Sequence, residues 1–286
     1  MVKMNAKNNG FLLILAMLII SSMAINAQPQ RVISLAPHIT EMVFRIGAGD
    51  RLVGRTEYCS YPPAAAEIPS IGAYLNPNYE KMVALKPDAV LIFPNAEMQA
   101  KLEQLNLKVI SVSNETIAEI FSGIRQLGEF FQKPDEAAQV VSGLKDTLDW
   151  IRSQTAQWPA RDALVLIGRE SGSLRGLYAA GEQTYLTELV NLCHIQNAFS
   201  DVRMRYFEVS KEDLVRQQPD IIMEFRVGTA KTDVAALQQD WQPLNILEAI
   251  KNDQLFIFKE KAFLIPGPRI GKTAMALYHS LREKMR

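Results

Sequence analysis

A 14-residue phrase that occurs twice constrains the fold of this chain more than any other feature. EKMVALKPDAVLIF begins at Glu80, and EDLVRQQPDIIMEF begins at Glu212, 132 residues later. In each phrase a short helix is expected to end before Pro-Asp, and an apolar run typical of a buried strand follows. A second pair, TEMV at 40–43 and TELV at 187–190, precedes the phrases in the same order. This repeated order predicts two lobes built on one plan.

Apolar or β-branched runs alternate with amphipathic segments along the chain. This alternation predicts an α/β fold, with mostly parallel sheets flanked by helices. Asn76-Pro77 is interpreted as a helix start, and Ser210 with Asp213 forms a capping-box pattern. We expect strands at 31–36, 51–55, 89–93, 108–113 and 162–168, and helices that include 39–46, 78–86 and 116–131.

Residues 135–158 contain no proline and repeat apolar residues at helical spacing. One continuous helix of about 24 residues would be about 36 Å long, enough to connect two lobes. The alternative is two shorter helices broken at Gly143. We divide the chain into a signal peptide at 1–27, an N-terminal α/β lobe at 28–134, a connecting helix at 135–158 and a C-terminal α/β lobe at 159–286.

The N-terminus has the pattern of an export signal. Lys3 and Lys7 precede the apolar run FLLILAMLII, and small residues follow up to Ala27. This pattern predicts a cleaved secretory signal peptide and a periplasmic location. The alternative, a membrane anchor, is weaker because the run is short for a hydrocarbon core of about 30 Å. Cys59 and Cys193 could pair across the two halves in an oxidising compartment, but we favour two buried free thiols.

Charge and motif content argue against several classes of function. Lys plus Arg equals Asp plus Glu, at 31 each, so no net field attracts nucleic acid. The sequence contains no phosphate-binding loop, HExxH or GxSxG motif, and no cluster of His, Asp and Glu with zinc-like spacing. We therefore expect no enzyme, no resident metal and no cofactor. The alternative from another class is an exported enzyme that uses a cleft between the lobes.

The chain resembles the periplasmic substrate-binding proteins of ABC importers for vitamin B12, haem and ferric siderophores, and most closely the vitamin B12-binding members. RVISLAPHITEMVFRIGAGDRLVGRT, YCSYPP, NPNYEKMVALKPDAVLI, EVSKEDLVRQQPDII and PGPRI carry the resemblance, in that order. It implies a helical-backbone fold, with two α/β lobes joined by one long helix. It also implies a monomer that captures a corrinoid between the lobes and delivers it to a membrane permease. A haem or a ferric siderophore is the alternative cargo.

The resemblance implies roles for individual residues as well. One acidic residue on each lobe of such proteins docks onto arginines of the permease dimer, and Glu80 and Glu212 occupy the matching positions. The alternative is that both are only helix-start residues, favoured by the positive end of the helix dipole. A broad apolar macrocycle also needs aromatic walls and a few oriented polar groups. The ligand-binding candidates are His38, Tyr58, Tyr74, Phe93, Tyr178, Tyr206, Phe263 and Arg269, with Arg169 and Arg205 as weaker ones.

Some of these assignments have alternatives. His38, placed on the first loop, is the one histidine expected to reach a metal in the ligand, and Tyr74 would ligate iron if the cargo were haem. Arg269 is the preferred rim donor because its planar fork suits carboxylate or amide oxygens. Cys193 matches the first cysteine of a disulfide in the characterised vitamin B12-binding relative. Tyr278 stands where the second would be, so no such bridge is expected.

Overall fold

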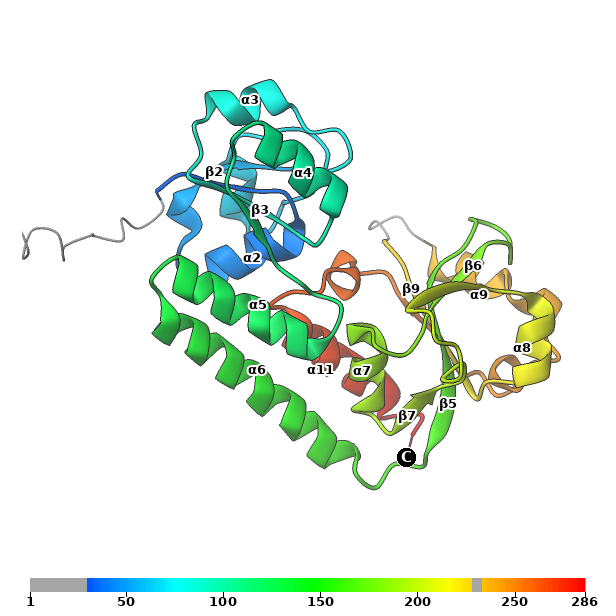
Figure 1. Ribbon diagram of the computed structural model, residues 1–286. Coiled ribbons are helices and arrows are strands. Elements are labelled where there is room, and N and C mark those ends of the chain that lie inside the picture. Colours follow the sequence, from blue (N-terminus) through cyan, green and yellow to red (C-terminus); the bar gives the residue numbers. More distant parts are fainter. Residues whose placement is uncertain (1–29, 228–232, 286) are drawn as a thin grey trace, which may run out of the picture.

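The structure is a computed structural model that describes residues 30–227 and 233–285. Two sheets with their flanking helices lie on either side of a central group of helices, along which one long helix runs (Figure 1). The α/β class predicted from the sequence is confirmed. The predicted signal peptide at 1–27 lies outside the described residues. Within the described ranges, no helix combines the length and apolar character needed to cross a bilayer.

The first sheet has four parallel strands in the order β2–β1–β3–β4. Its two central strands, β1 and β3, are buried along their whole length, which explains their continuous apolar sequence. The elements of this lobe are β1 (Val32–Ser34), α2 (Pro37–Arg45), β2 (Leu52–Arg55), α3 (Tyr79–Ala84), β3 (Ala89–Ile92), α4 (Ala96–Gln104), β4 (Val109–Ser111) and α5 (Ile117–Phe130).

The second sheet has the order β10–β9–β5–β6–β8, with β7 also paired to β5. β6 runs antiparallel to both of its neighbours, and the other pairs are parallel. Gly172 and Gly176 adopt φ angles of 70° and 58°, which allow the chain to reverse between β5 and β6. The elements are β5 (Arg161–Gly168), β6 (Leu177–Ala180), α7 (Tyr185–Asn191), β7 (Ile195–Asn197), β8 (Tyr206–Val209), α8 (Lys211–Gln217), β9 (Ile221–Phe225), α9 (Val234–Gln239), α10 (Glu248–Lys251), β10 (Leu255–Phe258) and α11 (Ile270–Leu281).

The connecting segment is one helix, α6 (Pro134–Thr155), and it continues through Gly143. Its 22 residues correspond to about 33 Å. A buried stripe that includes Leu144, Leu148 and Ile151 faces the rest of the protein, and the helix contacts α5 and α11 (Figure 1). Because α6 packs against α5 of the first lobe and α11 of the second, it is held as a fixed support rather than as a free linker.

The two repeated phrases fold as expected, with one correction. The capping box of Ser210 and Asp213 is confirmed at the start of α8. The predicted helix start at Asn76-Pro77 is wrong, because Asn76 lies in a bend and Pro77 forms a β-bridge with Gly72, so that the helix begins only at Tyr79. Asn78 is the actual cap residue, and its side chain accepts a hydrogen bond from the Lys81 amide.

Two carboxylates, Glu41 buried and Glu188 half-buried, join the lobes where the last helix of each lobe begins. Glu41 in α2 accepts two hydrogen bonds from Arg269, the N-cap residue of α11, at 2.7 and 2.6 Å. Glu188 in α7 accepts the backbone N–H of Ile117, the first residue of α5, at 2.6 Å. Each glutamate comes from one copy of the TEMV/TELV repeat and reaches the opposite lobe. We call these two interactions the crossed carboxylate contacts.

Neither cysteine forms a disulfide. Cys59 and Cys193 are both buried and free, and burial raises the pKa of the Cys193 thiol to about 12. Tyr278 stacks on Trp158, with ring centroids 5.7 Å apart, and meets Trp150 edge-on at 5.3 Å. Tyr278, Trp158 and Trp150 therefore form an aromatic cluster.

The Glu41–Arg269 pair should contribute to stability mainly by compensating a buried charge. The variant Arg269→Met should lower the free energy of unfolding by about 3–5 kcal/mol, because Glu41 stays buried without its cation. The double variant Glu41→Met/Arg269→Met should recover most of this loss, as measured by urea denaturation. Arg152→Met, which removes an exposed ion pair with Asp149, is the control and should change stability by about 1 kcal/mol or less. A loss in Arg269→Met no larger than in this control would contradict the interpretation.

Candidate functional site

An aromatic pair lies at the carboxyl end of β3 in the first lobe. Tyr74 and Phe93 are stacked, with ring centroids 4.2 Å apart and planes 25° from parallel. Both side chains are half-buried, so part of the pair remains accessible. Burial raises the pKa of Tyr74, and the Asn95 side chain lowers it in part, so the phenol is neutral near pH 7. The pair offers an apolar surface at the carboxyl ends of the strands, which is where open α/β sheets bind ligands.

His38 lies behind this pair rather than on a loop. It occupies the first turn of α2, is 5% exposed, and its ring centroid is 6.5 Å from that of Phe93. Burial lowers its pKa to about 3, and its Nε2 atom has no hydrogen-bond partner among the described residues. The placement on a loop was wrong because Pro37 starts the helix one residue earlier than His38. In this structure His38 supports the aromatic pair from within the protein.

A second aromatic pair lies on the other lobe. Tyr178 on β6 and Tyr206 on β8 are nearly parallel, with planes 20° apart and centroids at 6.4 Å. The Tyr206 hydroxyl donates a hydrogen bond to Glu115 of the first lobe at 2.9 Å, and the Glu115 carbonyl accepts the Tyr185 amide at 2.6 Å. Burial and the nearby Glu115 carboxylate raise the pKa of Tyr206. Four candidates thus form two aromatic pairs, one on each lobe.

Two other aromatic candidates have different environments. Phe263 is 2% exposed and packs against Phe225 and Phe258, with centroids 5.5 and 4.9 Å away. Its assignment to the ligand surface is corrected, because its side chain belongs to the core of the second lobe. Tyr58 is 52% exposed, and its carbonyl accepts a hydrogen bond from Lys261 across the lobes. Tyr58 therefore stays accessible near the junction.

Arg269 uses its guanidinium within the protein. Two of its nitrogens bind Glu41, and the group lies 4.3 Å from the Tyr61 ring centroid. This arrangement corrects its assignment as a rim donor, since its fork is already engaged by a carboxylate. Arg205 is exposed on the segment before β8.

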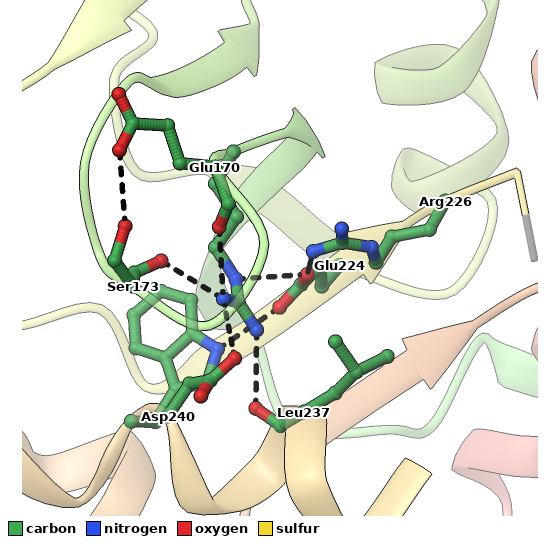
Figure 2. A network of polar contacts seen from close by, with 8 residues as sticks. Glu170, Ser173, Glu224, Arg226, Leu237 and Asp240 are labelled. Carbon is green, nitrogen blue, oxygen red and sulfur yellow. Dashed lines mark hydrogen bonds and ion pairs between the residues drawn. The ribbon is translucent and has the colours of Figure 1, made fainter. Parts of the chain in front are cut away.

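Arg169, the other weak candidate, is enclosed in a charge network of the second lobe. Figure 2 shows this network around Glu224, Arg226 and Asp240. Its side chain and that of Glu224 are both fully buried and are joined at 3.0 Å, and Asp240 binds Arg169 at 2.7 Å. The second oxygen of Glu224 accepts the indole N–H of Trp241 at 2.9 Å. Arg226 also binds Glu224, at 2.7 Å, and is the network's partly exposed cation. Arg169 is thus a structural residue, which corrects its assignment as a rim donor.

The two glutamates proposed for docking occupy equivalent positions. Glu80 and Glu212 are each the second residue of their helices, α3 and α8, and both are exposed. Neither side chain has a hydrogen-bond or ion-pair partner in the part of the chain that the structure describes. The two helices lie on the outer sides of the two lobes (Figure 1). Their charges are therefore available to a partner.

Comparison with known proteins identifies the family of this chain. The sequence profile of the family described as "Periplasmic binding protein" matches residues 32–262. The chain belongs to the periplasmic binding protein family. A vitamin B12-binding protein of Pectobacterium carotovorum subsp. carotovorum is 31% identical, over 85% of both chains. One of Pectobacterium atrosepticum is 29% identical, over 90% of both.

Solved structures of periplasmic binding proteins share this architecture. The periplasmic vitamin B12-binding protein BtuF of Vibrio cholerae has a TM-score of 0.75 at 26% identity, covering 89% of this chain and 97% of its own. The periplasmic haem-binding protein RhuT of Roseiflexus sp. RS-1 has a TM-score of 0.74 at 19% identity, covering 90% and 100%. The second likeness concerns the fold alone.

Several important residues were not identified from the sequence as parts of the site. Glu115, Glu224 and Arg226 have no motif that reveals their partners, which lie 91, 55 and 2 positions away respectively. Glu41 and Glu188 did carry a signal, because both lie in the repeated TEMV/TELV segments. Across residues 30–227 and 233–285, no three His, Cys, Asp or Glu residues are grouped in a way that could hold a metal ion.

His38 should make the protein less stable as the pH falls from about 6.5 toward about 3. The imidazole is neutral in the folded protein over this window but takes up a proton on unfolding, so acid favours the unfolded state. Between about pH 7 and pH 5 the wild type should lose about 2 kcal/mol more stability than His38→Leu, measured by urea denaturation. Met204→Leu, at an exposed and untitratable position, is the control and should keep the wild-type slope. Parallel pH profiles for wild type and His38→Leu would contradict this assignment.

Proposed function

We propose that this periplasmic binding protein captures a corrinoid of the vitamin B12 type between its lobes and delivers it to an ABC importer. The observation that carries the proposal is the combination of two aromatic pairs, Tyr74/Phe93 and Tyr178/Tyr206, with relatives named vitamin B12-binding proteins. A corrinoid has a broad apolar body with an amide-bearing rim, which suits aromatic walls and a few polar groups. On this proposal the protein binds its cargo without chemical change.

A haem or ferric siderophore is the second candidate. Likeness of fold to haem-binding proteins supports it, and Tyr74 is the residue that would ligate iron. The raised pKa of Tyr74 favours the neutral phenol, whereas iron ligation requires the phenolate. The stacked geometry of Tyr74 on Phe93 also suits an apolar contact better than ligation. These two features favour the corrinoid.

Export and docking belong to the same proposal. The leader at residues 1–27 would direct the chain to the periplasm, where the mature protein acts as a monomer. Glu80 and Glu212 would then contact arginines on the two halves of a permease dimer. Exposed ion pairs contribute little net affinity, so these contacts would set the orientation and the rate of encounter.

Cargo titration tests the ligand. Cyanocobalamin should bind with measurable heat in isothermal titration calorimetry, and Tyr74→Ala should weaken it about tenfold because an aromatic contact is lost. Tyr79→Phe, which alters the other tyrosine of the same segment, should leave the affinity unchanged. If haem is the cargo instead, the Soret band of haem should shift and sharpen on binding to the protein, and Tyr74→Phe should lose this change. Absence of binding to cyanocobalamin, haem and ferrichrome would reject the proposal.

Charge reversal tests the docking role. The double variant Glu80→Lys/Glu212→Lys should reduce stimulation of permease ATPase activity in vesicles about tenfold or more, because two like-charge contacts replace two ion pairs. Its affinity for cyanocobalamin should equal that of the wild type. Glu97→Lys, at an exposed first-turn position of α4, is the matched control and should stimulate normally. Loss of cargo binding in the double variant would instead assign the glutamates to the fold or the cargo site.

A further inference from the structure

A groove separate from the aromatic pairs lies where α2, α6 and α11 meet. Its volume is about 800 Å³, within the range of roughly 300–1,000 Å³ that is typical of small-molecule sites. Phe44 of α2, Val140 and Leu144 of α6, and Met275 of α11 give it apolar walls. The walls therefore come from both lobes and from the connecting helix. The proposed cargo site uses none of these four residues.

Gly143 keeps this groove open on the α6 side. Glycine inside a helix is less favourable than alanine, so its presence usually has a packing reason. At Gly128 of α5 that reason is clear, because an added Cβ would lie 2.4 Å from the Cβ of Ala137. At Gly143 an added Cβ would meet no atom within 4 Å. Helix packing does not require this glycine, and its effect is to leave space in the groove.

Positive charge surrounds the groove. Arg45 and Lys272 are exposed on its rim, and neither side chain has a hydrogen-bond or ion-pair partner within residues 30–227 and 233–285. Among the described residues that line the groove, Glu41 is the only carboxylate, and Arg269 already binds both of its oxygens. The rim thus carries uncompensated cations above an apolar floor.

We propose that this groove binds a free single-chain anionic amphiphile, such as a long-chain carboxylate. The head group would lie against Arg45 and Lys272, and the hydrocarbon chain would cover Phe44, Val140, Leu144 and Met275. Charge complementarity with Arg45 and Lys272 selects the acid, and the apolar walls supplied by three helices select the hydrocarbon chain. This site is independent of the corrinoid proposal.

Fluorescence titration with cis-parinaric acid and its methyl ester tests the site. The acid should bind saturably, and the ester, which has the same chain without the charge, should bind about tenfold more weakly. Gly143→Leu should weaken the acid about tenfold by filling the groove, while raising Tm by roughly 2–4 °C through better helix propensity. Arg45→Gln/Lys272→Gln should remove the difference between acid and ester.

The controls separate this site from cargo binding and from misfolding. Gly143→Leu should bind cyanocobalamin as the wild type does, and its unchanged or higher Tm shows that the fold is intact. Tyr74→Ala should leave the affinity for cis-parinaric acid unchanged. Equal binding of acid and ester to the wild type, no saturable binding of the acid, or full affinity in Gly143→Leu would each overturn the proposal. Binding to phosphatidylglycerol vesicles without binding of the free acid would also overturn it.

Discussion

The crossed carboxylate contacts are the interaction on which the rest of the molecule depends. Glu41 and Glu188 each leave one lobe and bind the start of the last helix of the other, at Arg269 and Ile117. Both carboxylates lie against groups that favour the charged form, although burial raises the pKa of each. A relative rotation of the lobes would separate the buried Glu41 from Arg269 and the half-buried Glu188 from the Ile117 amide, and the first separation is strongly unfavourable. The two contacts therefore hold the two aromatic pairs in a fixed relation.

This arrangement explains why the same short sequence occurs in both halves. The TEMV helix α2 follows β1 in the first lobe, the TELV helix α7 follows β6 in the second, and each supplies one glutamate. The later helix–Pro-Asp–strand phrase supplies a central strand and, at the helix start, an exposed glutamate. A shared plan thus gives two kinds of paired carboxylate, one pair hydrogen-bonded at the junction and one pair exposed on the outer sides.

Much of the fold could be predicted because it depends on local patterns. Three features could be predicted from their own residues alone. They are the apolar strands β1 and β3, the capping box at Ser210 and the long helix α6 with its apolar stripe. The start of α3 was missed because Pro77 suits an extended bridge as well as a helix start. The roles of the site residues were harder to predict, because they depend on partners that lie far away in the sequence. Nothing local shows that Arg269 is engaged by Glu41, or that Phe263 faces the core rather than the junction.

The positions of the three tryptophans have a practical consequence for optical work. Trp150 and Trp158 lie near the C-terminal end of the connecting helix beside Tyr278, and Trp241 is bound to Glu224 in the second lobe. The first lobe, with its Tyr74/Phe93 pair, contains no tryptophan. Indole emission from this protein therefore comes only from the second lobe and the region at the C-terminal end of α6. Only ligand contacts at the second lobe or at the end of α6 can touch an indole directly, whereas a ligand that absorbs no light and contacts the first lobe alone touches none.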